Sequence, residues 1–385
     1  MTSLLVVIVL VLLAVAIWQL TKIFDLTQVS SASDDSQVAN DDDNNVQGYL
    51  MFGFLAFIYI FTIYGVYTWG HLVLHTPASD HGATIDRLMN ITWVLIFTVQ
   101  AITQVLLHYF AFKYRGNKDK RALYFADNNK LEAIWSVIPA VVLAGLILYG
   151  LYAWTNIMFI DEDDDTIVVE LYAQQFKWTA RYAGADNVLG KANVRLIEGV
   201  NTLGVDLSDP YAQDDIVVSE LHIPKGKKIH FKMRSQDVLH SAYFPYFRAQ
   251  MNCVPGMVTE FAFTPIYTTA EYQALPYMVE KVANINAIRA KKSLELVAKG
   301  EPGLDPYTFE YLLLCNKICG SSHYNMQMKV VVDTPEDYKK WLSEKTNLVA
   351  EVKASKAEPA APDASSAKDT TVVKDTAAVA KIAMK

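Results

Sequence analysis

The chain has few cysteines and no excess of positive charge. Its 385 residues include three cysteines and carry a formal net charge of −7. Three cysteines do not make a disulfide framework, and an acidic chain gives no indication of nucleic-acid binding. The sequence Cys-x-x-Cys-His does not occur in it, which excludes a covalently attached c-type haem. The cysteines therefore need another explanation.

Long apolar stretches, by contrast, are abundant. Hydrophobic residues make up 52% of the chain, and four stretches come close to or exceed the ~18 residues expected of a membrane span. These stretches are 3–20, 49–69, 91–112 and 134–159. The first could be a cleaved signal peptide, but it lacks a basic start and exceeds the ~7–15 residues usual for a signal core. We therefore expect a retained span with an acidic linker over 1–47, and an additional span with its outer loop over 48–82.

The connection between the third and fourth stretches is basic. Asp119 and Asp127 are opposed there by six cations, which are Lys113, Arg115, Lys118, Lys120, Arg121 and Lys130. Cationic loops remain in the cytoplasm. Residues 83–160 are therefore predicted to form a transmembrane hairpin with a cytoplasmic loop, and everything after Phe159 is predicted to lie on the periplasmic side of a bacterial inner membrane.

From about Thr166 the chain changes to short, alternating, β-branched runs separated by turns such as Pro224-Lys225-Gly226. The clearest predicted strands are 166–174, 215–222, 228–234, 308–314 and 327–333. Short strands at this spacing suggest a Greek-key β-sandwich. Residues 161–349 are predicted to form this periplasmic domain.

Two segments depart from the strand pattern. Residues 267–306 contain a helical run from Ala270 to Leu296 with mixed charge, either a plain surface helix or a docking surface for a partner subunit. Residues 350–385 are mostly Ala, Lys, Asp, Pro and Ser. They lack the apolar residues needed to offset ordering entropy and are predicted to be disordered.

The most specific pattern is Cys-Asn-Lys-Ile-Cys-Gly-Ser-Ser-His-Tyr-Asn-Met at 315–326. Two thiolates, an imidazole and a thioether are soft ligands that select copper, zinc or iron–sulfur centres. Zinc sites use Cys, His and carboxylate, and iron–sulfur clusters usually need four cysteines. Cysteine and histidine with a weak methionine are the ligands of electron-transfer copper, and a second thiolate on the same loop can bridge two coppers.

A dinuclear centre needs a second imidazole, and the candidate is His240 in Ser-Gln-Asp-Val-Leu-His-Ser at 235–241. Asp237 in this segment is either a hydrogen-bonding partner that orients it or a turn residue. His222 and His230 lie in alternating strand patterns and are predicted to be surface or packing residues. Cys253 is predicted to be a small buried hydrophobe and not a ligand.

Asp-Val-Leu-His-Ser at 237–241, followed by Cys-x3-Cys-Gly-Ser-x-His-x2-Met, resembles subunit II of the haem-copper cytochrome c oxidases. The resemblance continues at 131–139 (Leu-Glu-Ala-Ile-Trp-Ser-Val-Ile-Pro) and at 247–257 (Phe-Arg-Ala-Gln-Met-Asn-Cys-Val-Pro-Gly-Met). It covers roughly 83–342 apart from the insertion. It implies a membrane-anchored all-β protein, in which transmembrane helices precede a cupredoxin-like sandwich with a binuclear CuA centre.

The same resemblance implies roles for individual residues. The copper ligands would be His240, Cys315, Lys317 through its backbone carbonyl, Cys319, His323 and Met326, with the two thiolates bridging two copper ions and one imidazole on each copper. Glu132 matches the family's glutamate at the entrance of a proton path into the catalytic subunit.

Three positions depart from the family pattern. Gln-Gln-Phe-Lys-Trp at 174–178 has Phe176 where the family has the tryptophan that receives electrons, while Trp178 matches a second tryptophan. Both are candidates for electron input. Lys317 replaces a glutamate that helps hold magnesium, and Asn252 stands where an aspartate is often found, so no magnesium site is expected.

The implied function is that of subunit II of an aa3- or caa3-type cytochrome c oxidase. It would accept electrons from a periplasmic c-type cytochrome, or from a cytochrome-bearing complex in a supercomplex, and pass them to haem a. The expected partners are subunit I with its haem and CuB, subunit III and membrane lipid. Oxygen reduction to water and proton translocation would take place in the larger enzyme.

Three other functions are possible. A metal-free subunit II of a quinol oxidase would lack the ligand set. The CuA domain of nitrous oxide reductase would need a further large domain, and copper delivery or storage fits poorly with four spans and the Glu132 motif.

Overall fold

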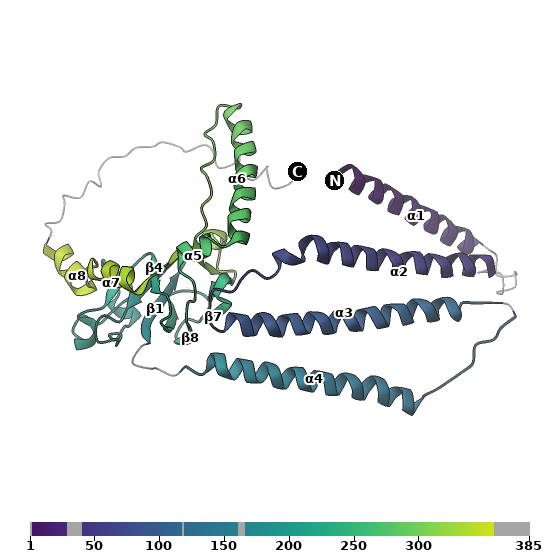
Figure 1. Ribbon diagram of the computed structural model, residues 1–385, viewed down its shortest axis with the longest axis horizontal. Coiled ribbons are helices and arrows are strands. Elements are labelled where there is room, and N and C mark those ends of the chain that lie inside the picture. Colours follow the sequence, from purple (N-terminus) through teal and green to yellow (C-terminus); the bar gives the residue numbers. More distant parts are fainter. Residues whose placement is uncertain (1, 29–40, 118, 161–165, 358–385) are drawn as a thin grey trace. The chain divides into compact units, whose positions relative to one another are not determined.

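The computed structural model describes residues 2–28, 41–117, 119–160 and 166–357 (Figure 1). They divide into two compact units. The first comprises Met1–Pro77 and His81–Asn156, and the second comprises Ala78–Asp80 and Ile157–Lys385. The first unit is helical, and the second holds all the named strands.

Four helices form the first unit. They are α1 (Thr2–Gln28), α2 (Asp41–Trp69), α3 (Gly82–Lys113) and α4 (Asn129–Met158). Three of them, α2 with its extension to Leu72, α3 and α4, are long and apolar enough to cross a membrane. The second to fourth apolar stretches thus form helices of spanning length. Among the described residues, the apolar part of α1 is Ile8–Thr21, which is shorter, and its role as a retained span stays a prediction.

The additional span α2 packs against α3. The hydroxyl of Tyr59 donates a hydrogen bond of 2.6 Å to the carbonyl of Ala101. Gly48 lies directly against the ring of Phe112, where a Cβ atom would come within 2.8 Å of the ring. In lipid, small residues and interhelical hydrogen bonds hold helices together, because apolar burial alone gains little there. The two helices therefore have a specific interface.

Two five-stranded sheets form the second unit. The first sheet has the order β3-β2-β1-β5-β8, with bounds Ile216–Val218, Lys177–Tyr182, Ile167–Gln174, Ile229–Ser235 and Thr259–Phe263. The second has the order β4-β10-β9-β6-β7, with bounds Leu221–Pro224, Gln327–Asp333, Tyr311–Cys315, His240–Phe244 and Ala249–Cys253. β1 pairs with β5 in parallel, and β10 pairs with β4 in parallel, while the other pairs are antiparallel.

The predicted β-sandwich is thus confirmed, with one correction to its strands. Residues 215–222 do not form one strand, because the chain leaves the first sheet after Val218 and joins the second at Leu221. The core between the sheets is aromatic. Phe231 and Phe244 each lie 5.3–5.5 Å, centroid to centroid, from Phe263.

Three residues from the connection between α2 and α3 are built into this sandwich. The amide of Ala78 donates to the carbonyl of Tyr246 (2.7 Å), and its own carbonyl accepts from Ile266 (2.9 Å). The hydroxyl of Ser79 donates to the carbonyl of Phe247 (2.6 Å). Both Ala78 and Ser79 are completely buried. This part of the connection therefore belongs to the sandwich unit.

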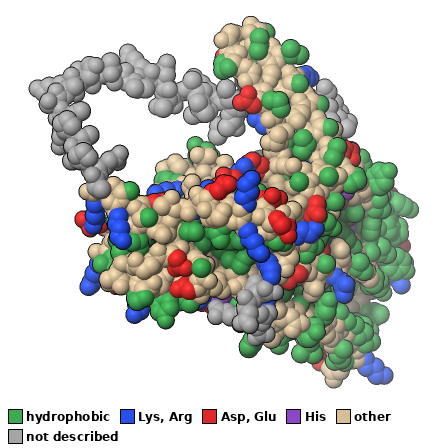
Figure 2. All heavy atoms as spheres, turned by 60° about the vertical axis from the view of Figure 1, so that its left-hand side comes forward, with side chains coloured by type: hydrophobic (Ala, Val, Ile, Leu, Met, Phe, Trp, Pro, Cys, Tyr) green, Lys and Arg blue, Asp and Glu red, His purple; other side chains and the backbone are tan. Residues whose placement is uncertain are grey.

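The insertion forms α5 (Thr269–Gln273) and α6 (Pro276–Val297), so the predicted helical run is divided in two. Pro276 occupies the first turn of α6, where its missing N–H costs nothing. The beginning of α6 is anchored by the buried Met278, and the helix extends away from the sheets (Figure 1). Farther along, the side chain of Asn286 donates to the carbonyl of Tyr307 (3.0 Å) and accepts from its amide (2.7 Å). In the space-filling view of the molecule in Figure 2, apolar side chains and charged side chains of both signs are interspersed.

The prediction that the tail is disordered from about Ala350 is wrong for residues 350–357. After α7 (Pro335–Ser343), the chain forms α8 (Leu348–Ala357). Leu348 and Val352 are buried against Leu203 and Tyr172, and this apolar contact supplies the burial that the composition did not suggest. The remainder of the tail, 358–385, lies outside the described residues.

A buried ion cluster lies on the first sheet. Arg181 binds Glu170 through Nε (2.6 Å) and Asp215 through Nη1 (2.9 Å), and Arg234 also binds Glu170. Burial raises the pKa of Asp215 to about 6, although Arg181 opposes the shift. One oxygen of this carboxyl, Oδ1, is buried without a hydrogen-bond partner among the described residues, which accounts for the preference for a proton.

Candidate metal centre

The predicted ligands are held by adjacent strands of the second sheet. Cys315 ends β9, Met326 immediately precedes β10, and His240 begins β6, which pairs with β9. The base of the ligand loop is closed by a hydrogen bond from the amide of Cys315 to the carbonyl of Met326 (3.1 Å). A turn at His323–Asn325 returns the chain to β10. Both ends of the loop are therefore fixed by sheet hydrogen bonds.

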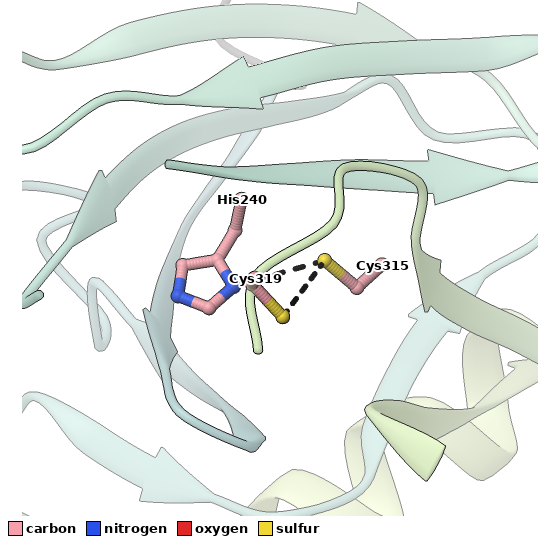
Figure 3. A group of neighbouring side chains, drawn as sticks. All are labelled: His240, Cys315 and Cys319. Carbon is pink, nitrogen blue, oxygen red and sulfur yellow. Dashed lines mark hydrogen bonds between the residues drawn. The ribbon is translucent and has the colours of Figure 1, made fainter. Parts of the chain in front are cut away.

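The soft donor atoms converge on the two thiols, which Figure 3 shows together with His240. Cys315 Sγ lies 3.8 Å from Cys319 Sγ and 3.7 Å from His240 Nδ1. Cys319 Sγ lies 3.5 Å from His323 Nδ1 and 3.8 Å from Met326 Sδ. The Lys317 carbonyl oxygen is 3.2 Å from Cys315 Sγ. Every ligand predicted from the sequence thus belongs to one group of contacts.

These distances fit metal ions between the donors. Metal–sulfur bonds are about 2.3 Å and metal–nitrogen bonds about 2.0–2.1 Å, so one ion can touch two sulfurs that are less than about 4.6 Å apart. The two thiols meet this condition at 3.8 Å. For a sulfur and an imidazole nitrogen the corresponding limit is about 4.4 Å, and the two pairs lie 3.5 and 3.7 Å apart. His240, Cys315 and Cys319 also form a buried group whose ligand atoms all lie within 4.8 Å of one another.

Asp237 fixes the orientation of His240. Its Oδ1 lies 2.8 Å from His240 Nε2, and Oδ2 accepts from the amide of Gln175 (2.7 Å). Burial opposes ionisation of Asp237, but the hydrogen bonds from His240, Gln175 and Val238 lower its pKa below the usual value. A carboxylate at Nε2 leaves the Nδ1 lone pair for a metal. The prediction that Asp237 orients this segment therefore agrees with its contacts.

Burial raises the pKa of two of the cysteines, Cys319 and Cys253. Burial raises the pKa of Cys319 to about 11, with a further contribution from Cys315. Cys253, paired directly across from His240, is completely buried, and burial raises its pKa to about 12. Its complete burial agrees with the prediction of a small buried side chain.

The two aromatic candidates for electron input occupy different positions. Trp178 is 3% exposed, and its ring lies edge-on to His240 with centroids 6.2 Å apart. Phe176 is half-buried and touches the ligand loop, since a Cβ atom on Gly320 would come within 2.8 Å of its ring. A docked protein could thus reach Phe176, while Trp178 lies beneath the ligands.

The other singled-out histidines pack within the sheets. His222 binds Asp333 (2.6 Å) and stacks on Trp341 at 4.2 Å. His230 is 2% exposed and lies 3.3 Å from Glu260. Of the two predicted roles, surface or packing, these contacts agree with packing.

Glu132 and Lys317 are both exposed. Glu132 lies in the first turn of α4, at the predicted start of the fourth span. Lys317 directs only its carbonyl oxygen towards Cys315. Asn252 is also exposed, in β7. The predicted lack of a magnesium site at Lys317 and Asn252 stays a prediction.

Two residues near the predicted ligands were missed by the sequence interpretation. Gln175 joins the β1–β2 turn to both Asp237 and the ligand loop, because its side chain donates to the carbonyl of Cys319. Gly320 has a φ of +138°, which a side chain would strain. Nothing in the sequence near Gln175 signals a contact with a loop 144 residues away, whereas Gly320 could have been noticed as a glycine between two ligands.

Comparison with known proteins identifies the family. Residues 67–153 match the family described as cytochrome c oxidase subunit II, transmembrane domain. The alternative cytochrome c oxidase subunit 2 of Bradyrhizobium diazoefficiens is 34% identical over 272 residues, which are 70% of this chain and 83% of the relative. The cytochrome c oxidase subunit 2 of Thermostichus vulcanus is 23% identical over 297 residues, covering 70% of this chain and 78% of the relative.

Among solved structures, the periplasmic domain of subunit II of cytochrome oxidase from Bradyrhizobium japonicum is 18% identical, with a TM-score of 0.27. The match covers 48% of this chain and 95% of the solved chain. The extent and identity of the match to the Bradyrhizobium diazoefficiens relative show that the chain belongs to the cytochrome c oxidase subunit II family.

Proposed function

We propose that this subunit of a haem-copper oxidase carries a binuclear CuA centre and transfers electrons. The proposal is carried by one observation. Two thiols 3.8 Å apart share a buried site with two imidazoles, a thioether and a backbone carbonyl. The copper ligands proposed are His240, Cys315, Cys319, His323, Met326 and the Lys317 carbonyl.

Bound copper would supply a one-electron redox couple, and the protein would keep its geometry constant as the charge changes. Asp237 holds His240 by its Nε2 atom, so the Nδ1 atom points to the thiols. Gln175 fixes the carbonyl of Cys319, and the strands fix Cys315 and Met326. A site held on several sides in this way has a low reorganisation cost, which favours transfer over chemistry on a substrate.

In this proposal the electron donor is a periplasmic c-type cytochrome, or a cytochrome-bearing complex, that docks near Phe176. The acceptor is haem a in catalytic subunit I of an aa3- or caa3-type enzyme, where oxygen is reduced and protons are translocated. Glu132 would sit at the entrance of a proton path into that subunit. The α3–α4 loop would be cytoplasmic and the sandwich periplasmic.

A metal-free subunit of a quinol oxidase is the alternative. It would give no reason for two buried thiols, an imidazole and a thioether to face one another in one site. The observed convergence of soft donors favours copper.

Electron paramagnetic resonance of the purified full chain, loaded with copper, tests the proposal. A delocalised two-copper hyperfine pattern is expected. Cys253→Ser is the matched control, because this cysteine is buried nearby but is not a proposed ligand, and it should give the same spectrum. A four-line mononuclear spectrum, or failure to bind copper, would contradict the binuclear centre.

A further inference from the structure

Three consecutive apolar side chains are almost fully exposed in the connection between α3 and α4. Leu123 is 84% exposed, Tyr124 is 91% exposed and Phe125 is 76% exposed. The described residues around them, 119–128, are also exposed, so this segment does not pack on its own helices. Side chains of this size are not normally left in water together.

The position of this segment restricts what can cover it. It joins two helices of membrane-spanning length. The first, α3, ends at Lys113, and the second, α4, begins at Asn129. Because Ala78 and Ser79 are built into the sandwich, α3 begins on the side of the sandwich and ends on the opposite side. A connection of this length between two spans keeps the segment close to the membrane surface on that opposite side.

The charges next to the apolar triplet are positive. Lys120 and Arg121 precede it, separated from Leu123 by Ala122 alone, and both are exposed. The amide of Lys120 donates to the carbonyl of Asn117 (3.1 Å). Arg115 is unavailable for the same role, since its guanidinium is engaged by Asn45 (2.7 Å) and the carbonyl of Phe112 (2.8 Å).

Acidic groups limit how far the charge argument extends. Asp119 and Asp127 flank the segment, and the first turn of α2 contains three aspartates. A general positive field is therefore not the basis of the inference. The basis is the close spacing of two cations and, one residue later, a leucine, a tyrosine and a phenylalanine, which is typical of segments at the membrane interface.

We propose that this segment is a membrane-surface anchor. Leu123, Tyr124 and Phe125 insert at the boundary between the headgroups and acyl chains of the cytoplasmic leaflet, and Lys120 and Arg121 bind the phosphates of anionic phospholipids. The inference rests on the proposed membrane topology and is independent of copper. Its effect is to hold the entrance end of α4, which includes Glu132, at a fixed depth.

Photo-crosslinking from within the assembled oxidase tests what covers the segment. Tyr124→p-benzoylphenylalanine, irradiated in the native membrane and analysed by mass spectrometry, should yield mainly phospholipid adducts. The same substitution at Tyr211, which is 51% exposed on the sandwich unit, is the control and should yield none. Crosslinks to a protein subunit, or no adduct at Tyr124, would overturn the proposal, while the copper spectrum of the same sample reports separately on the electron-transfer function.

A charge variant tests the phosphate contacts. The full chain carrying the Tyr124 crosslinker, reconstituted in vesicles, should form more adducts with phosphatidylglycerol than with phosphatidylcholine. Lys120→Gln and Arg121→Gln should each reduce this preference by roughly fivefold. The control replaces two exposed lysines that follow each other in α6, Lys291→Gln with Lys292→Gln. It should leave the preference for phosphatidylglycerol intact. An unchanged preference in the Lys120 and Arg121 variants would overturn the assignment of lipid phosphates to these residues.

Discussion

The sandwich contains two buried polar clusters that are completed in different ways. In the cluster around Arg181, the chain supplies both charges, since the guanidinium binds the carboxylates of Glu170 and Asp215. In the cluster around Cys319, the neighbouring atoms are two sulfurs and an imidazole nitrogen. The nearby Lys317 contributes its carbonyl oxygen, while its side chain is exposed.

The difference lies in where the positive charge comes from. A buried ion pair is costly to desolvate, and removing one partner leaves an uncompensated charge. In the thiol cluster the cation would come from a bound metal, which displaces thiol protons. The first cluster thus pairs charges that the chain itself supplies, and the second has the donor atoms to bind an ion from solution.

Cys319→Ser should break the second cluster with the largest effect. Its sulfur contacts the other thiol, an imidazole and the thioether, so its loss should weaken copper binding by more than about 100-fold, the upper range for lost supporting groups alone. Copper titration followed by paramagnetic resonance measures this. An unchanged spectrum in Cys319→Ser would contradict the ligand assignment, and Cys253→Ser serves as the control.

Arg181→Met should break the first cluster and leave copper binding intact. Removal of one partner of a buried ion pair typically costs about 3–5 kcal/mol, which urea unfolding monitored by tryptophan fluorescence would detect. Arg181→Met combined with Asp215→Leu should recover part of this loss, because the unpaired carboxyl is also removed. No recovery would mean that the cost arises from packing and not from charge.

The pH dependence of stability should reveal Asp215. Its folded pKa is about 6, above its unfolded value of 3.8, so the folded state binds the proton more tightly. Its contribution to the free energy of unfolding is therefore full below pH ~4 and is lost as the pH rises to about 6, by roughly 3 kcal/mol. Unfolding measured between pH 4 and 7 should show a smaller decline in Asp215→Asn, and an identical decline in both proteins would contradict the expectation.

Met326→Leu should have the smallest effect on stability. The two side chains have similar volumes, so the cost should remain below about 1.5 kcal/mol even though the residue is 1% exposed. Copper should still bind through the stronger ligands, but the reduction potential should change, because a weak axial donor tunes the potential. Potentiometric titration checks this, and an unchanged potential would remove Met326 from the ligand set.

The site could be predicted from the sequence better than its surroundings could. Most of the ligands lie within twelve residues, at fixed spacing, and alternating patterns located β10 because one of its faces is buried. The split between β3 and β4 was not predictable, because both halves carry the same strand pattern. The contact of Gln175 with the ligand loop depends on tertiary packing between distant segments, and no local pattern encodes it.

The burial of Ala78 and Ser79 in the sandwich has a consequence for assembly. The ribosome makes these residues before any strand of the sandwich, and they lie between two helices of membrane-spanning length. Their hydrogen bonds to Tyr246, Phe247 and Ile266 form only when that segment and the later strands have reached the same compartment. Completion of the sandwich can thus act as a checkpoint that only correctly inserted chains pass.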